Sequence, residues 1–394
     1  MPWQTRDMID QRTEFVMRAL ETENFRALCS EYGISPKVGY KWKKRFLENG
    51  LEGLKDQSRR PRSSPESLGE EVVCRIIKLK ERHRLWGPQK IRAVYLRQWG
   101  EAPSESSFKR VLERCGMTEK RLPRRSTETG RIASGKKASA SNEVWTVDFK
   151  GWWHDAEGRC DPLTVRDEYS RYILELRALP DAKSDTVKAC FERLFERHGV
   201  PGAIRSDNGP PFASPNGLLG LSRLSVWWLA NGIDLERGRP GCPQDNSAHE
   251  RMHKDIARAL ERAPYKERQP AFETWRREFN EERPHQSLGM RTPAEVYVNS
   301  AASWSGTPEQ ICYPRMSVRK VNRTGKIVYG KEGVFVSQAL AGWEVGLSPR
   351  SDSSLDVYFS RLLLGRLEPE TAAFIPVTAA VAAGNAAETS SSTD

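Results

Sequence analysis

Residues 142–149 read NEVWTVDF, and their alternating pattern decides the fold of the central domain. Val144, Thr146 and Asp148 fall on one face of an extended chain, because successive side chains of a strand point to opposite faces. The segment CDPLTVRDEYSRYILELRAL (160–179) then holds two further β-rich runs, broken at 167–170. Three consecutive strands in meander order are the simplest account of this pattern.

Helical and extended patterns alternate after these strands. SDTVKACFERLFERHG (184–199) has helical spacing, AIRS (203–206) is a short strand that runs into Asp207, and LLGLSRLSVWWLANG (218–232) predicts another helix. IDLERGR (233–239) predicts a strand, and NSAHERMHKDIARALERA (246–263) predicts a helix that begins near Asn246. The order β-β-β-α-β-α-β-α indicates a mixed α/β domain over 142–300, with helices packed on a central sheet.

The excess of positive over negative charge lies entirely in the first third of the chain. Residues 1–140 hold 31 Lys and Arg against 18 Asp and Glu, a net charge of +13, which leaves −2 of the total of +11 for residues 141–394. A basic module joined to a nearly neutral one favours a nucleic-acid-binding front end that delivers a different activity. A Lys- and Arg-rich surface without a ligand is the alternative.

Two short helices around a tight turn are predicted within 24–48, in a domain of residues 1–56. Ser35 can cap a helix that starts at Pro36, where the missing N–H of proline has no cost. The second helix is expected to turn Val38, Trp42 and Phe46 toward the first. This layout predicts a helix-turn-helix, and its expected DNA contacts are Lys37, Tyr40, Lys41 and Lys44. An ordinary helical hairpin with a solvated lysine face is the alternative.

A second helical module is predicted at 67–118, with Ser104 as a helix cap, and it also suggests a helix-turn-helix. The linker between the two modules, 57–66, is rich in Arg, Ser and Pro and suits the minor groove or the phosphate backbone. Its expected DNA contacts are Arg59, Arg60 and Arg62. The segment 119–141 is rich in Ser, Gly and basic residues and is expected to be a flexible linker.

The pentapeptide HERMH (249–253) allows two interpretations. His249, Glu250 and His253 match the H-E-x-x-H pattern of zinc peptidases, for which Glu273 could be offered as a third ligand. Alternatively, Glu250 joins Asp148 and Asp207 as one of three carboxylates that hold hard cations through oxygen ligands. The zinc interpretation explains neither the basic front end nor the two aspartates.

The motifs around these acids occur in a characteristic order: VWTVDF (144–149), LTVRDEYSRY (163–172), IRSDNGPPF (204–212), PQDNSAHERMHKD (243–255) and FNEERPHQSLGMRTPAEVY (279–297). Together they resemble DDE-class insertion-sequence transposases, whose catalytic core is RNase H-like and closest to retroviral integrases. The resemblance covers about residues 20–300. It implies that Asp148, Asp207 and Glu250 are the catalytic triad and hold two Mg²⁺ ions, for which Mn²⁺ can substitute.

The resemblance also implies a reaction and partners. The expected enzyme is a metal-dependent polynucleotidyl transferase that binds the ends of an insertion element, frees a 3′-OH and joins it to target DNA by two-metal transesterification. Its partners would be double-stranded DNA and further copies of itself, at least a dimer on DNA. A catalytically silent DNA-binding regulator derived from a transposase is the main alternative, and the zinc peptidase is a minor one.

The sequence departs from the wider class at two places. Many members have a shorter interval between the second Asp and the Glu than the 42 residues found here, 208–249. Some carry a Lys two helical turns after the Glu, where this sequence has Ala257, so Lys254 or Arg258 is expected to make that DNA contact. Supporting roles are expected for the turn at Asn208 and Gly209, for Asn246 as a helix cap, and for His253 near metal or phosphate.

The last segment of the chain changes pattern again. Short β-like runs separated by Gly, Asn, Ser and Pro predict a small all-β barrel over 308–370, and 371–394 is expected to be a disordered tail. No run of about 18 apolar residues and no signal peptide is visible, and seven scattered cysteines form no C-x-x-C pair. The expected location is the bacterial cytoplasm, in association with the nucleoid.

Overall fold

The computed structural model describes residues 8–56, 68–118, 137–238, 247–261, 267–308 and 310–377. The chain divides into two compact units, Met1–Val72 and Val73–Asp394. The predicted linker 57–66 lies outside the described residues, as does most of the predicted linker 119–141. Within the described part of the chain, no helix is long and apolar enough to cross a membrane.

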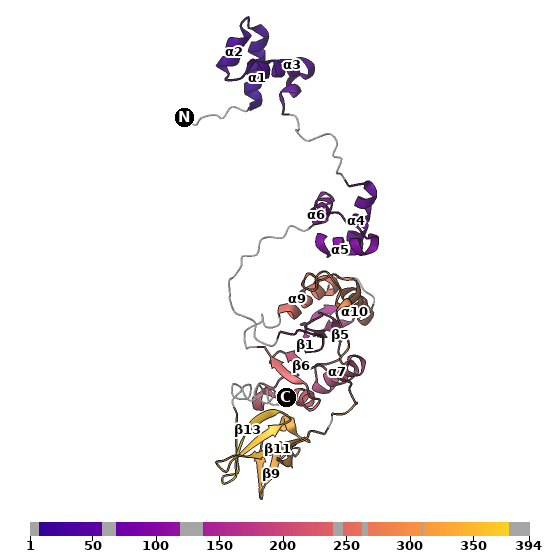
Figure 1. Cartoon of the computed structure of the whole chain (residues 1–394), viewed down its shortest axis with the longest axis vertical. Coiled ribbons are helices and arrows are strands. Elements are labelled where there is room, and N and C mark those ends of the chain that lie inside the picture. The colour runs from indigo at the N-terminus through magenta and orange to yellow at the C-terminus, as the bar shows by residue number, and fades with distance from the viewer. Residues whose placement is uncertain are drawn as a thin grey trace. The chain divides into compact units, whose positions relative to one another are not determined.

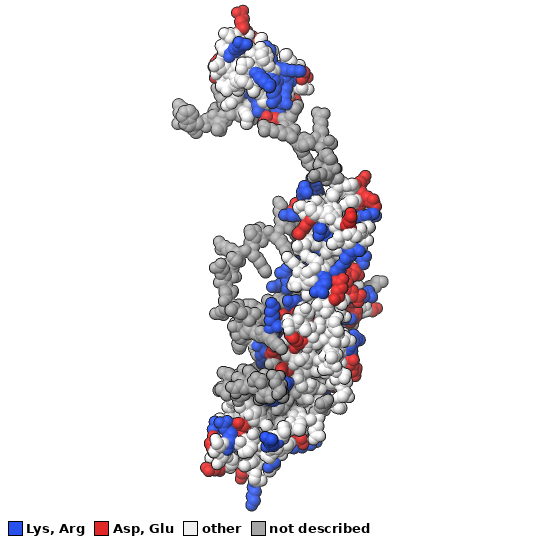
Figure 2. All heavy atoms as spheres, in the orientation of Figure 1, with Lys and Arg blue, Asp and Glu red and all other residues white. Residues whose placement is uncertain are grey.

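The first unit contains the predicted helix pair and one further helix before it. The helices are α1 (Met8–Glu21), α2 (Phe25–Glu31) and α3 (Pro36–Asn49), followed by a 3₁₀ turn, η1 (Gly50–Leu54). The Ser35 hydroxyl accepts a hydrogen bond from the N–H of Val38, so α3 begins at the predicted cap with Pro36 in its first turn. Lys and Arg side chains gather on the side of this module where α3 lies (Figures 1 and 2).

The inner face of α3 differs from the prediction at one position. Val38 was expected to face the first helix, but its side chain is exposed, and Gly39 takes the buried place instead. A Cβ atom at Gly39 would lie 2.6 Å from Cys29 Sγ and 3.0 Å from ring carbons of Phe15 and Phe25. The helices approach so closely here that only glycine fits, whereas Trp42 is buried as predicted.

The second helical module is also formed as predicted. Its helices are α4 (Glu70–Arg82), α5 (Pro88–Trp99) and α6 (Glu105–Arg114), and the Ser104 hydroxyl caps α6 by accepting from the N–H of Ser107. Buried Ile76, Ile91 and Phe108 each come from a different helix of the module.

A five-stranded mixed sheet forms the centre of the second unit. Its strands are β1 (Val144–Phe149), β4 (Pro162–Asp167), β5 (Ile173–Ala178), β6 (Ala203–Ser206) and β7 (Asp234–Arg237), in the order β5-β4-β1-β6-β7. A short hairpin, β2 (Trp153–Asp155) and β3 (Gly158–Cys160), separates β1 from β4. The β1, β4 and β5 strands are antiparallel neighbours, whereas β1, β6 and β7 are parallel, so the predicted element order is confirmed.

Helices cover both faces of this sheet (Figure 1). On one face, α7 (Ser184–His198) and α8 (Arg223–Ala230) pack on Trp145, Val147, Leu163 and Val165. On the other, α9 (Ser247–Ile256), the π-helical turn η4 (Ala257–Glu261), α10 (Arg268–Arg277) and a second π-helical turn, η5 (Glu278–Glu282), pack against β5 and the hairpin. Two 3₁₀ turns follow, η6 (Gln286–Leu288) and η7 (Pro293–Glu295).

The single helix predicted over 218–232 is wrong. A 3₁₀ turn, η2 (Leu218–Gly220), contains Leu219 at φ 52°, and α8 starts only after Ser222. The hydroxyl of Ser222 accepts from the N–H of Ser225, and the Ser225 hydroxyl accepts from the N–H of Ser222, which is a capping box.

Residues 317–376 form an all-β region. One antiparallel sheet consists of β8 (Ser317–Lys320), β11 (Glu344–Pro349), β12 (Leu355–Phe359), β13 (Leu362–Glu368) and β14 (Ala373–Pro376). A separate pair consists of β9 (Lys326–Tyr329) and β10 (Glu332–Phe335). A 3₁₀ turn, η8 (Gln338–Leu340), follows β10. Strand β14 corrects the predicted tail, which cannot begin at 371. The ladders make two sheets, so closure into one barrel stays a prediction.

The close crossing at Gly39 gives a stability prediction. Gly39→Ala should destabilise the first unit by about 1–3 kcal/mol through overpacking, although Ala normally favours a helix over Gly. Hydrogen exchange of peptides that cover residues 25–49 in the intact chain measures this. Cys29→Ala removes the nearest atom, so the double variant should exchange more slowly than Gly39→Ala alone; faster exchange would contradict the crossing.

Candidate functional site

The sheet face under α9 carries polar side chains in an otherwise apolar pair of strands. Asp148 lies opposite Thr164, and Thr146 lies opposite Arg166, in the antiparallel β1–β4 register. Because side chains alternate along a strand, these four residues share one face while their apolar neighbours fill the core on the other. Thr146 and Thr164 are fully buried.

Two histidines of α9 dock on these threonines. His249 Nδ1 lies 2.8 Å from Thr146 Oγ1, and His249 Nε2 lies 2.6 Å from Thr164 Oγ1. His253 Nε2 lies 2.8 Å from the same Thr164 oxygen. Burial lowers the pKa of His253 to about 3, and burial also lowers the pKa of His249, so both rings are neutral.

The geometry contradicts a zinc site of the H-E-x-x-H kind. Both ring nitrogens of His249 contact threonine hydroxyls, and its side chain is fully buried. Glu273, the suggested third ligand, accepts hydrogen bonds from Arg276 and Gln269 on its own helix. No three His, Cys, Asp or Glu side chains are preassembled for a metal ion among the described residues.

Asp207 reaches the same edge of the sheet from the neighbouring strand. Strands β1 and β6 are parallel with Thr146 opposite Arg205, so Asp207 comes level with Asp148 two residues further along. Two hydrogen bonds hold the turn after Asp207. Asp207 Oδ1 accepts from the N–H of Gly209 at 3.2 Å, and the Asn208 side chain donates to the carbonyl of Gly238, just after β7, at 2.7 Å.

Asp148 experiences the negative charge of its neighbours. Its pKa is raised to about 7, first by burial and then by the charges of Asp207, Asp161 and Glu250. Glu250 lies in the first turn of α9, directly after the buried His249. The two aspartates and the glutamate, separated widely in sequence, therefore lie within electrostatic reach of one another around Asp148.

Several residues of this region were not predicted. Thr164 and Thr146 anchor α9, Asp161 adds charge near Asp148 while accepting from the N–H of Gly151, and Arg237 at the end of β7 interacts electrostatically with Asp207. A signal existed for the threonines, because polar residues alternate with apolar ones along both strands. No comparable pattern marked Asp161 or Arg237.

The predicted DNA contacts lie on exposed surfaces where the structure describes them. Lys37, Tyr40 and Lys41 are exposed on α3, and Lys44 is exposed with its Nζ 3.8 Å from a Glu48 carboxylate oxygen. The Tyr40 ring stacks on Phe25 at 4.2 Å between centroids, so its orientation is fixed. Lys254 and Arg258 are exposed on α9 and η4. The remaining predicted residues, Arg59, Arg60, Arg62 and Asn246, lie outside the described residues.

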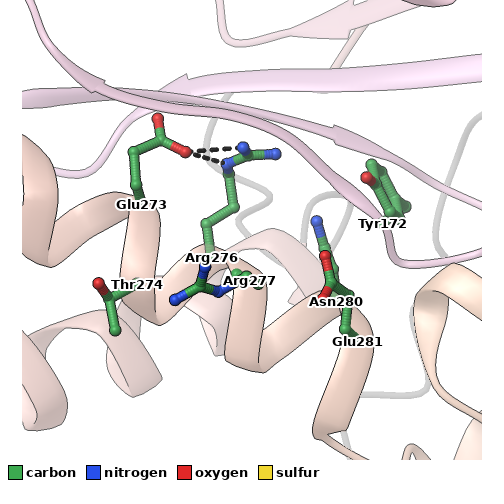
Figure 3. A pocket seen from close by; sticks show the side chains of 7 residues that line it. All are labelled: Tyr172, Glu273, Thr274, Arg276, Arg277, Asn280 and Glu281. Atoms are coloured by element: carbon green, nitrogen blue, oxygen red, sulfur yellow. Dashed lines mark hydrogen bonds and ion pairs between the residues drawn. The ribbon is translucent and has the colours of Figure 1, made fainter.

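A separate cavity of about 280 Å³ lies along α10 and η5 (Figure 3). Its lining includes Tyr172, Asn280 and the Glu273–Arg276 ion pair, with Thr274, Arg277 and Glu281. It shares no residue with the carboxylates around Asp148, so it is not part of the candidate site.

Both the N-terminal helical modules and the sheet domain after them match known protein families. The description "Integrase core domain" matches residues 138–243 and again residues 231–293. Residues 11–62 match "Helix-turn-helix domain", and residues 38–112 match "Homeodomain-like domain". The integrase matches include Asp148, Asp207 and Glu250.

Similar proteins come from bacterial insertion elements. An uncharacterized 31.7 kDa protein of insertion element IS407 from Burkholderia multivorans is 25% identical over 245 residues, which are 61% of this chain and 86% of the relative. An uncharacterized 39.2 kDa protein of insertion element IS476 from Xanthomonas euvesicatoria is 22% identical over 262 residues, 63% of this chain and 71% of the relative.

Among solved structures, the HTLV-2 integrase catalytic core domain in complex with magnesium is similar over 40% of this chain and 97% of that one, with a TM-score of 0.32 and 16% identity. The family matches and the insertion-element relatives agree with the order of modules along the chain. The chain is similar to these insertion-element proteins, and its helix-turn-helix matches precede its matches to an integrase core domain.

Proposed function

We propose that Asp148, Asp207 and Glu250 are the catalytic carboxylates with which the chain cleaves the ends of its insertion element and joins them to target DNA. The observation that carries this proposal is the convergence of three acids from β1, from the end of β6 and from the first turn of α9. Carboxylates gathered at a sheet edge are suited to phosphodiester chemistry with hard cations.

The proposed reaction consists of two in-line displacements. In the first, water attacks a phosphorus atom at the element end, a new P–O bond forms, and the bond to the 3′ oxygen breaks to leave a 3′-OH and a 5′-phosphate. In the second, that 3′-OH attacks a target phosphodiester and displaces its 3′ oxygen. One P–O bond forms for each bond that breaks, so no external energy source is required.

Asp148, Asp207 and Glu250 would hold two divalent cations, Mg²⁺ or Mn²⁺, once their side chains turn toward the ions, since the three carboxylates are not preassembled in this structure. Oxygen ligands suit these cations, and positive charge relieves the repulsion that raises the pKa of Asp148. When bound, such cations supply Lewis-acid activation and neutralise charge at the phosphate. Asp207 is exposed, and the N–H of Gly209 engages only its Oδ1, so Oδ2 is the oxygen that would face a cation.

The basic modules support DNA recognition by the same chain. We infer that Lys37, Tyr40, Lys41 and Lys44 contact the element end, that Lys254 and Arg258 contact phosphates beside the site, and that at least two copies assemble to join two ends. The two C-terminal sheets share one apolar core that includes Ile327, Val334 and Val345, which supports a small barrel-like domain. A silent regulator is not favoured, because Asp148, Asp207 and Glu250 are all present within the stretches that match an integrase core domain.

Neutralising one acid at a time tests the assignment. Asp148→Asn, Asp207→Asn and Glu250→Gln should each reduce cleavage of a labelled element-end duplex by at least about 100-fold, since each removes several kcal/mol of transition-state stabilisation. Binding to the same duplex should persist. Asp161→Asn is the matched control, because Asp161 also raises the pKa of Asp148 but lies outside the proposed triad. Full cleavage by a triad variant would sink the assignment.

The raised pKa of Asp148 predicts that Asp148→Asn, which should reduce cleavage, increases the stability of the folded protein. The Asp148 carboxyl has a pKa of about 7 in the folded protein, against an ordinary value of 3.8. Folding therefore keeps its full stability below pH 3.8, where the carboxyl is protonated in both states, and loses stability as the pH rises from 3.8 to about 7. Asp148→Asn avoids this loss and should stabilise the chelator-treated protein by on the order of 3 kcal/mol at pH 8. The gain in Tm should be smaller at pH 5; an equal gain at both values would contradict the charge argument.

Salt dependence tests the α3 contacts. Replacing Lys37, Lys41 and Lys44 together with Ala should lower the slope of log Kd against log salt by about 1 per lysine. Fluorescence anisotropy with the element end measures this slope. The matched variant replaces the same residues with Arg, which keeps the charge and should keep the slope; equal slopes for both variants would exclude these lysines as phosphate contacts.

A further inference from the structure

One hydroxyl group fixes the protonation of the histidine beside Asp148. Thr164 Oγ1 lies 2.9 Å from the carbonyl oxygen of Asp148, 2.6 Å from His249 Nε2 and 2.8 Å from His253 Nε2. A hydroxyl has one proton to donate and two lone pairs to accept with, and a carbonyl oxygen can only accept. With all three contacts made, Thr164 donates to Asp148 and both histidines donate their Nε2–H to Thr164. Thr146 then donates to His249 Nδ1 at 2.8 Å rather than to the Arg166 carbonyl at 3.3 Å, which keeps His249 neutral.

This assignment leaves the other ring nitrogen of His253 with a lone pair. His253 Nδ1 faces Asp148 Oδ2 at 3.9 Å, which is too long for a hydrogen bond. A lone pair of His253 Nδ1 and a carboxylate oxygen of Asp148 thus belong to atoms that lie 3.9 Å apart. Such a pair is suited to a positive ion between the two atoms, since imidazole nitrogen and carboxylate oxygen both bind first-row divalent metals.

Glu250 lies on the same helix as His253, one turn before it. Glu250 and His253 are three residues apart on α9, so their side chains project from one face of the helix. A glutamate and a histidine at this spacing form the E-x-x-H pair with which helical proteins hold iron and manganese. Within HERMH, the last four residues thus have ligand spacing, whereas His249 has both nitrogens engaged with threonines.

We propose that His253, through Nδ1, is a nitrogen ligand to the cation held by Asp148 and Glu250, and that Thr164 is the positioning residue that keeps this nitrogen unprotonated. The inference rests on the proposed function, because it adds a ligand to the same cation site. It predicts a site that favours Mn²⁺ over Mg²⁺, since imidazole suits transition metals and Mg²⁺ prefers oxygen ligands alone.

The direct test is pulsed electron paramagnetic resonance of Mn²⁺ added to the full chain. A bound imidazole nitrogen modulates the electron spin echo of Mn²⁺, and the modulation changes when the protein is made with ¹⁵N-labelled histidine. The wild-type chain should show this modulation. His154→Gln is the matched control, because His154 is exposed on β2, outside the site, and its loss should change nothing.

Substitutions at His253 and at Thr164 test the proposed metal ligand and the proposed positioning residue separately. His253→Gln keeps an amide N–H that can donate to Thr164 but has no ring nitrogen, so the modulation should disappear and Mn²⁺ affinity should fall about tenfold or more, with a smaller change for Mg²⁺. Thr164→Val removes the hydroxyl and should weaken Mn²⁺ binding by about 10–100-fold, as loss of a ligand-orienting partner does. Thr164→Ser restores the hydroxyl and should restore the modulation.

The outcomes test the role of His253 separately from the proposed catalytic role of the three carboxylates. Wild-type protein that binds Mn²⁺ without nitrogen modulation would overturn the role of His253 and leave the three carboxylates as the site. Wild-type protein that binds neither Mn²⁺ nor Mg²⁺, with or without an element-end duplex, would overturn both proposals. Modulation that survives in His253→Gln would also reject the inference, because the nitrogen would then come from elsewhere.

Discussion

The hydroxyl of Thr164 joins three parts of the candidate site, and the placement of α9 over the sheet depends on it. It lies within hydrogen-bonding distance of the backbone of β1 at Asp148 and of two histidines of α9. Because Thr164 and His249 are buried, losing one partner would leave an unsatisfied polar group, which costs about 1–3 kcal/mol. The network therefore fixes both the distance and the rotation of the helix that carries Glu250.

This arrangement explains why HERMH, which allowed two interpretations from the sequence, allows only one in the folded chain. HERMH matches a zinc-peptidase pattern only if both histidines are free to bind metal. The fold instead buries His249 against Thr146 and Thr164, where it acts as an anchor, and leaves His253 beside Asp148. The polar face of β1 and β4 is what decides between the meanings, so the motif cannot be interpreted apart from the sheet.

The element order and several helix starts could be predicted from local sequence. Ser35, Pro36 and Ser104 mark helix starts through their own capping chemistry, and the alternation in NEVWTVDF marks β1. Local patterns failed where long-range packing decides. Val38 was placed inside because it is apolar, yet the close approach of α2 to α3 requires Gly39 there. The helix expected over 218–232 is divided by Leu219 and by the capping box at Ser222.

The candidate site also combines residues that local motifs could predict with contacts that depend on long-range packing. The three acids could be proposed from their motifs, but the histidine and threonine contacts join residues 85–103 positions apart and depend on strand register. Asp161 and Arg237 carry no local pattern that relates them to Asp148 or Asp207. Arg237 comes near Asp207 because β6 and β7 are parallel neighbours, and Asp161 comes near Asp148 because β4 pairs with β1.

Anomalous diffraction from the protein with Mn²⁺ and an element-end duplex would locate the cation. We expect an anomalous peak within bonding distance of carboxylate oxygens of Asp148 and Glu250 and of His253 Nδ1, with Thr164 still contacting both histidines. A peak bound to His249, or one remote from Asp148, would contradict the proposed site.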